Sequence, residues 1–153
     1  MKKYLCLLTL CACGFTPMFS GDKTDIYVST INGINGIELR NALNSKFGGQ
    51  KEPTAPYTLT VSLNNPTTKY KALERTGDAT WQEIQLRANY VLKHGDEQIA
   101  AGTEIASESY TFVRYLVAAN ASYNNAVANT ITVLADKIGT RAIADVAAYE
   151  QKK

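Results

Sequence analysis

The sequence predicts a single α+β domain, a two-layer sandwich in which a mixed four-stranded sheet carries two helices on one face. Three observations support this prediction: several segments alternate apolar and polar residues as strands do, two segments repeat apolar residues every three or four positions as helices do, and the order is strand, helix, strand, strand, strand, helix. A chain of 153 residues can bury a hydrophobic core of ordinary size without a metal or a disulfide framework.

The domain is expected to begin with a strand and a turn. Residues 25–31 alternate in polarity and predict a strand whose inward side is formed by Ile26, Val28 and Thr30. Residues 32–36 contain two Asn-Gly pairs, which are typical of tight turns. We therefore expect the chain to reverse direction before the first helix.

The first helix is expected over residues 37–47. Its apolar residues recur at helical spacing and are Leu39, Ala42, Leu43 and Phe47. Gly48 follows at a position that favours a left-handed helix end. Residues 50–56 carry two prolines and predict a loop, whereas residues 57–63 alternate apolar and hydroxyl side chains and give the clearest strand signal in the chain.

A long hairpin is expected next. Residues 81–92 alternate as a strand, residues 93–97 are polar and predict a turn, and residues 98–110 predict the returning strand. The inward side of the returning strand is expected to carry Ile99, Ala101, Thr103 and Ile105. The hairpin must be antiparallel, while the helix between the first two strands allows those two to lie parallel.

The last element is expected to be an amphipathic helix over residues 120–148. Its apolar positions recur every three or four residues and are Tyr123, Val127, Ile131, Leu134, Ile138 and Ala142. Asn120 or Ser122 could cap its start, because short polar side chains accept hydrogen bonds from the first turn. Gly139 weakens the helix locally and indicates a bend.

Residues 1–12 have the features of an export signal. Lys2 and Lys3 precede an apolar run that is too short to span a bilayer. Residues 10–13, Leu-Cys-Ala-Cys, resemble the bacterial lipobox, in which the last Cys is lipidated and becomes the mature N-terminus. We therefore predict that Cys13 is lipidated, that residues 13–23 are a tether and that residues 24–150 form the domain; an ordinary cleavable signal is the alternative.

Charge and cysteine content narrow the possible functions. Removal of the signal takes away two lysines and leaves 14 basic and 14 acidic residues, so the mature chain is formally neutral. No dense Lys/Arg stripe is present, so we expect no nucleic-acid partner. Cys6 and Cys11 leave with the signal, and lipid on Cys13 leaves no thiol for a disulfide or a nucleophile.

The sequence contains no recognisable catalytic or metal-binding motif. His94 is the only histidine and falls in the predicted hairpin turn, where we expect it to be solvated. Glu104 and Glu108 lie on the same side of the returning strand, which we expect to be an exposed sheet face. We therefore expect a protein that is not an enzyme and that uses no metal or cofactor.

Two surface features indicate partners. Lys69, Lys71 and Arg75 form the densest basic patch of the mature chain and are candidate ligands for the phosphates of an anionic lipid head group; a solvated strand end is the alternative. The final helix carries a nearly uncharged polar face, which suggests coverage by another protein unless it is simply an exposed helix of low charge. This face consists of Asn124, Asn125, Asn129, Thr130 and Thr132.

The whole layout resembles the lipopolysaccharide-assembly lipoprotein family LptE in its alphaproteobacterial form. The resemblance rests on the lipobox, on the Cys-Gly-Phe-Thr-Pro-Met-Phe start at residues 13–19, on the element order, and on Ser109-Tyr110 before an Ala-rich final helix. It covers essentially the whole chain. The sequence departs from the family at residues 124–132, where the family usually has many charged residues.

The resemblance implies an outer-membrane lipoprotein that is anchored through Cys13 and faces the periplasm. Members of that family act as plug and assembly partner of the LptD β-barrel and bind lipopolysaccharide. For this chain, Lys69, Lys71 and Arg75 are then the first candidates for the lipid A phosphates. The alternative is a generic envelope lipoprotein that binds or scaffolds another periplasmic partner.

Overall fold

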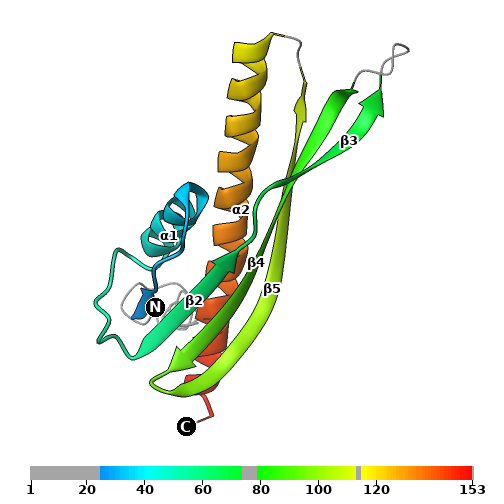
Figure 1. Ribbon diagram of the computed structural model, residues 1–153. Coiled ribbons are helices and arrows are strands. Elements are labelled where there is room, and N and C mark those ends of the chain that lie inside the picture. Colours follow the sequence, from blue (N-terminus) through cyan, green and yellow to red (C-terminus); the bar gives the residue numbers. More distant parts are fainter. Residues whose placement is uncertain (1–24, 74–78, 113–114, 153) are drawn as a thin grey trace, which may run out of the picture.

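Both helices of the domain pack on one face of a mixed sheet (Figure 1). The computed structural model describes residues 25–73, 79–112 and 115–152. The elements are β1 (Ile26–Val28), α1 (Ile34–Lys46), β2 (Tyr57–Leu63), β3 (Thr67–Leu73), β4 (Ala79–His94), β5 (Glu97–Thr111) and α2 (Leu116–Glu150). The predicted α+β sandwich is confirmed, but in the described residues the sheet has five strands where four were expected.

Strand β4 is the centre of the sheet. Along one edge it pairs with β5 over its whole length; along the other, its second half pairs with β2 and its first half with β3, all antiparallel. Strand β1 pairs with β2 in parallel, with Ile26 opposite Tyr57. The predicted parallel pair and antiparallel hairpin are both present.

Strand β3 was missed because its sequence, TTKYKAL, does not alternate apolar and polar residues. Its extended conformation comes from pairing with β4. Pro66 separates β2 from β3, since proline has no N–H to donate to a ladder. The Asn64 N–H still donates to the Arg87 carbonyl at 2.9 Å, so both strands follow the same edge of β4.

The predicted inward side of the returning strand was wrong beyond its first residues. The pairing shifts between Leu92 and Lys93, and this irregularity reverses which alternate residues of β5 face the helices. Ile99 packs against the core as predicted. Ala101, Thr103 and Ile105 are exposed, whereas Ala106 is buried.

Helix α1 begins earlier than predicted. The second Asn-Gly pair, expected to form a turn, lies in its first turn, and Gly33 stands before it with φ of 85°. Leu39, Leu43 and Phe47 are fully buried, which confirms the predicted apolar face. Strand β1 is shorter than expected, and Thr30, which was placed on its inward side, is exposed.

Helix α2 also begins earlier, at Leu116, so neither Asn120 nor Ser122 caps it. The helix continues without interruption through Gly139, which is buried. Thr130, which was assigned to the exposed polar face, is fully buried and its hydroxyl donates to the Ala126 carbonyl at 2.7 Å. The predicted apolar positions from Val127 onward are all buried.

Candidate functional site

Two of the residues predicted to have a function, Cys13 and Arg75, lie outside the described residues. The other two members of the predicted basic patch, Lys69 and Lys71, are exposed on β3. Glu83 on β4 lies opposite Lys69 in the strand pairing, and its Oε2 is 3.0 Å from the Lys71 Nζ. Glu83 therefore neutralises part of the positive charge that the sequence suggested.

Large apolar side chains are exposed on the elements that lie at one end of the molecule, where Figure 1 shows the ends of β3, β4 and β5 and the start of α2. We call this group the apolar tip; it consists of Tyr70, Trp81, Phe112, Tyr115, Leu116 and Val117. Tyr115, Leu116 and Val117 are 82%, 74% and 84% exposed. Apolar groups of this size that stay in contact with water typically mark a site of interaction. Lys69 and Lys71 flank Tyr70 in the sequence, but Lys69 pairs with Glu83 on the uncovered face of the sheet, whereas Tyr70 pairs with Gln82 on the face toward the helices.

Glu104 and Glu108 lie on the same side of β5, as predicted, but this side faces α2 and is not the exposed face of the sheet. The Glu104 Oε1 is 2.7 Å from the Arg141 Nε on α2. One turn earlier, the Lys137 Nζ donates to the Ile105 carbonyl at 2.7 Å. These contacts attach α2 to the edge strand.

His94 is half-buried and is not a solvated turn residue as predicted. It lies between the rings of Tyr57 and Tyr149, with centroid distances of 5.1 and 5.3 Å. The Tyr57 hydroxyl donates to Glu150 at 3.0 Å, and burial, followed by this hydrogen bond, raises the pKa of Tyr57 to about 12. This cluster joins the last turn of α2 to the β4–β5 hairpin.

The opposite face of the sheet is covered by neither helix. Its outward positions on β2 and β5 carry no charged side chain and are rich in hydroxyl groups, whereas β4 between them presents Glu83, Arg87 and Lys93 on the same face. We call this surface the hydroxyl face; it includes Thr58, Thr60, Ser62, Thr103, Ser107 and Ser109. The hydroxyl side of β2 is therefore exposed as predicted, and β5 extends it.

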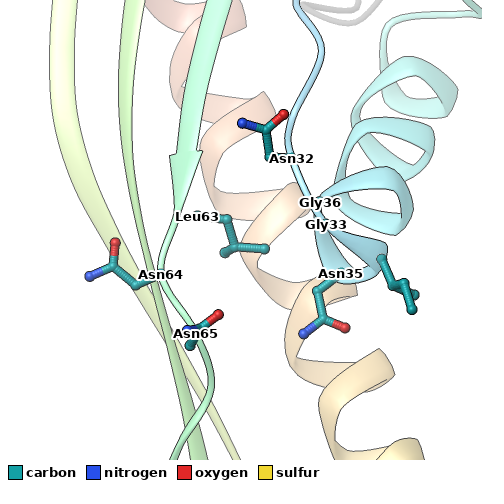
Figure 2. A pocket seen from close by; sticks show the side chains of 8 residues that line it. Asn32, Gly33, Asn35, Gly36, Leu63, Asn64 and Asn65 are labelled. Carbon is teal, nitrogen blue, oxygen red and sulfur yellow. The ribbon is translucent and has the colours of Figure 1, made fainter.

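A cleft lined by asparagine side chains opens where α1 begins. Figure 2 shows Asn64 and Asn65, from the segment after β2, across from Asn32 and Asn35 at the start of α1. These four residues line a cavity of about 270 Å³, with Leu63 between the two sides. Asn32 and Asn35 were predicted to lie in turns, and Asn64 and Asn65 had no predicted role.

The way the chain turns before α1 shapes this cleft. A Cβ atom on Gly36 would lie 2.8 Å from the Ile31 carbonyl oxygen, so only glycine allows the helix start to pack against the preceding segment. Across the cleft, Pro66 ends the ladder of β2 and leaves Asn64 and Asn65 in a non-strand segment.

A second cavity of about 350 Å³ adjoins the first and shares Ile34 and Asn35 with it. Its other walls come from Glu38 on α1 and from Tyr123 and Asn124 on α2. We call the two cavities together the asparagine cleft. Its five asparagines come from three distant stretches of sequence, so no local motif could have revealed it. The available signals were the Asn64-Asn65 pair at a strand end and Asn124 on the uncharged polar face of the final helix.

The described residues contain no group of three or more His, Cys, Asp and Glu side chains arranged to hold a metal ion. Neither α1 nor α2 is both long enough and apolar enough to cross a membrane, and the search covered only the part of the chain that the structure describes.

No protein-family profile and no curated protein sequence matches this chain. Solved structures do match it. A structure of a candidate lipoprotein from Caulobacter crescentus superimposes with a TM-score of 0.68 at 19% identity, covering 85% of this chain and 96% of that one. The chain shares its fold.

Two further structures with this fold are also described as lipoproteins. The rare lipoprotein B of Shewanella oneidensis matches with a TM-score of 0.61 at 14% identity over 84% of this chain and 96% of its own. A minor lipoprotein of Acinetobacter baumannii matches with a TM-score of 0.60 at 14% identity over 80% and 92%. At these identities the likeness establishes the common fold, and any common function is a matter for proposal.

Proposed function

We propose that this chain is an outer-membrane lipoprotein of the lipopolysaccharide-assembly machinery, anchored through Cys13 and seated as a plug in the LptD β-barrel. Its role is non-catalytic and depends on shape and contact. Support comes from the lipobox-like start, from the family resemblance of the sequence, and from a fold that is shared with several proteins described as lipoproteins.

The observation that carries the proposal is the uncovered hydroxyl face. Exposed surfaces of soluble proteins are usually rich in Lys, Glu, Arg and Asp. The outward positions of β2 and β5 have none, while β4 between them carries Arg87 and Lys93 on this face. The interior of a transmembrane β-barrel is polar. Hydroxyl groups can exchange hydrogen bonds with such a wall without burying an unpaired charge.

The apolar tip and the cations of β3 suit an amphiphilic ligand. Lipopolysaccharide combines acyl chains with phosphates, and Lys69 is an exposed cation on β3, on the opposite face of the strand from Tyr70. Lys71 forms an ion pair with Glu83, so we rank Lys69 ahead of Lys71 as a phosphate ligand. Arg75 remains a candidate. Strand β1 lies at the hairpin end of the sheet, which is the opposite end of the domain from the apolar tip.

The decisive experiment is purification of the full-length lipidated chain from its native envelope in a mild detergent. We expect one large β-barrel to co-purify in equal amount, and depletion of the chain to lower the level of folded barrel. If no barrel co-purifies, and barrel level and surface lipopolysaccharide are unchanged on depletion, the plug proposal is wrong.

Lipopolysaccharide binding is tested with three single variants and one control. Lys69→Ala and Arg75→Ala are expected to weaken binding several-fold, because each removes a cation that can pair with phosphate. Glu83→Gln is expected to strengthen binding, because it releases Lys71 from its ion pair. Lys93→Ala is the control, since Lys93 is exposed at the hairpin end of β4. Equal binding by all four variants would remove these residues from the proposal.

The second candidate is a generic envelope lipoprotein that binds or scaffolds another periplasmic partner. The observation that favours it is that the matching structures are described only as lipoproteins, with no barrel partner in their descriptions. The same purification distinguishes the two, because a smaller periplasmic protein recovered in place of a barrel supports this alternative.

A further inference from the structure

We propose that the asparagine cleft binds a neutral saccharide. The inference concerns a site that the proposed function does not use. Its basis is the chemistry of the residues that line the cleft, and it holds whether or not the chain occupies a barrel.

The lining of the cleft favours a ligand that is polar but uncharged. Carboxamide groups both donate and accept hydrogen bonds, as sugar hydroxyl groups do. Asn32, Asn35 and Asn65 line the first cavity and Asn124 lines the second, whereas Figure 2 shows the Asn64 carboxamide on the side of its strand away from α1. Glu38 is the only charged residue among the walls, so the cleft has neither the cations that bind phosphate nor the carboxylate cluster that binds a metal ion.

The four carboxamides that line the cleft are available for a ligand. Within the described part of the chain, none of the four makes a side-chain hydrogen bond to another residue, in contrast to Asn89, which accepts from the Thr103 hydroxyl at 2.7 Å. Three of them are exposed and Asn35 is half-buried, so water occupies their hydrogen-bonding positions. A ring with several hydroxyl groups can replace those waters and reproduce their hydrogen bonds.

The cleft also has apolar surface against which a sugar ring can pack. Ile34 stands between the two cavities with 79% of its surface exposed, and Leu63 and Tyr123 form part of the walls on either side. A pyranose ring has an apolar C–H face as well as hydroxyl groups, and small-molecule sites typically combine apolar walls with a few polar groups. The combination of Ile34 with the carboxamides matches both parts of such a ring.

The dimensions suit a short saccharide. The two cavities of about 270 and 350 Å³ meet at Ile34 and Asn35, and each is near the lower end of the roughly 300–1,000 Å³ found for ligand sites. Two linked rings can therefore occupy one cavity each. Because the cleft is open to solvent, we expect a weak site with a dissociation constant on the order of 1 mM.

Two envelope glycans share this chemistry, and the experiment separates them. The full chain in detergent micelles is mixed with the disaccharide of N-acetylglucosamine, which represents the cell-wall glycan, or with a deacylated and dephosphorylated lipopolysaccharide core oligosaccharide. Saturation-transfer NMR observes the ligand and detects binding at millimolar affinity. We expect transfer to at least one of the two, and the tighter binder identifies the source.

Matched variants link any binding to the cleft. Asn35→Ala combined with Asn65→Ala removes a carboxamide from each side of the cleft and is expected to weaken binding at least about tenfold, which corresponds to about 1.4 kcal/mol. Asn41→Ala is the control, because Asn41 is exposed on α1 but lines neither cavity. Thermal unfolding of each variant verifies that the domain is intact.

The possible results are decisive. Loss of transfer in the double variant, with binding retained by Asn41→Ala, supports the proposal. The proposal is overturned if neither saccharide binds at about 10 mM, if the double variant binds as well as the parent, or if inorganic phosphate displaces the sugar, which would indicate an anion site. A barrel that fails to co-purify leaves these outcomes unchanged, so the two proposals fail separately.

Discussion

Gly102 on β5 lies directly opposite Tyr90 on β4, and its missing side chain leaves the space that the tyrosine ring occupies. A Cβ atom at Gly102 would be 2.9 Å from both Cε1 and the hydroxyl oxygen of Tyr90. Tyr90 is only 3% exposed, and burial raises its pKa. The glycine therefore allows a large side chain to fill the space between the sheet and α2.

Gly102→Ala is expected to destabilise the domain by about 1–3 kcal/mol, because the added methyl group overpacks a well-filled site. Urea unfolding measures the loss. Ala101→Ser, on the exposed neighbouring position, is the control and is expected to stay within about 0.5 kcal/mol of the parent. Combining Gly102→Ala with Tyr90→Leu should cost less than the sum of the two changes; strict additivity would show that the two residues do not compete for space.

Gly139 has a similar role between the two helices. A Cβ atom there would lie 2.5 Å from the Lys46 Cδ, and the Lys46 ammonium group pairs with Asp136 on α2. In a Lys46→Ala background, Gly139→Ala is expected to stabilise the domain by about 1 kcal/mol, since alanine is the better helix former. In the parent the gain should be smaller, because the lysine side chain must move. An equal gain in both backgrounds, measured by urea unfolding, contradicts this explanation.

Asp145 on α2 is expected to reduce stability at neutral pH. Burial raises its pKa, and Arg141 only partly opposes the effect. Because the folded-state pKa lies above the unfolded value, the ionised carboxylate is disfavoured in the native state; the favourable contribution of the neutral form is present at acid pH and is lost as pH rises through the folded pKa. Asp145→Asn should therefore stabilise the domain at pH 7.

The stabilising effect of Asp145→Asn should disappear below the unfolded pKa of 3.8, where the aspartate is neutral in both states. Asp136→Asn is the matched control on the same helix. It removes an exposed ion pair with Lys46 and should leave stability unchanged or slightly lower. A gain from Asp145→Asn that persists at the same size in acid would rule out burial of the charge as its cause.

Tyr57 should make the domain sensitive to alkali. Its pKa is raised to about 12, first by burial and then by its hydrogen bond to Glu150. The stability that the neutral hydroxyl contributes is complete below the unfolded value of 10.0 and is lost as pH rises from there to about 12. Tyr57→Phe should flatten this part of the stability profile, measured as the urea midpoint against pH.

Two observations verify the origin of the alkaline effect. Ultraviolet titration of phenolate should show one fewer late-titrating group in Tyr57→Phe than in the parent. Tyr115→Phe is the control, because Tyr115 is 82% exposed and its removal should leave the stability profile intact. If the profile of Tyr57→Phe falls as steeply as that of the parent, another group is responsible.

Side-chain periodicity was sufficient to predict much of the fold. Leu39, Leu43 and Phe47 on α1 recur at helical spacing, and all three are fully buried. Leu59 and Leu92 were expected on inward faces of their strands and lie opposite each other in the β2–β4 pairing. Such patterns are readable in a sequence because one side of each element must be apolar to reach the core.

Features that depend on distant residues could not be read from the sequence. Strand β3 is extended because its residues pair with β4, which is distant in the sequence. The inward residues of β5 were misassigned because one shift of pairing after Leu92 reverses the alternation that follows. The apolar tip likewise joins Tyr70 to Leu116, which are far apart in the chain, and each alone reads as an ordinary apolar residue.

In the candidate site, too, some features could be predicted from local sequence and others depend on tertiary contacts. Lys69 and Lys71 were found from local charge density, but their pairing with Glu83 depends on the register between β3 and β4. The asparagine cleft was not predicted at all, because Asn32, Asn64 and Asn124 belong to different elements. Local spacing determines which side of a helix or strand is apolar, since that requires only neighbouring residues. Tertiary packing alone decides which polar groups meet, since their proximity depends on strand register and helix placement.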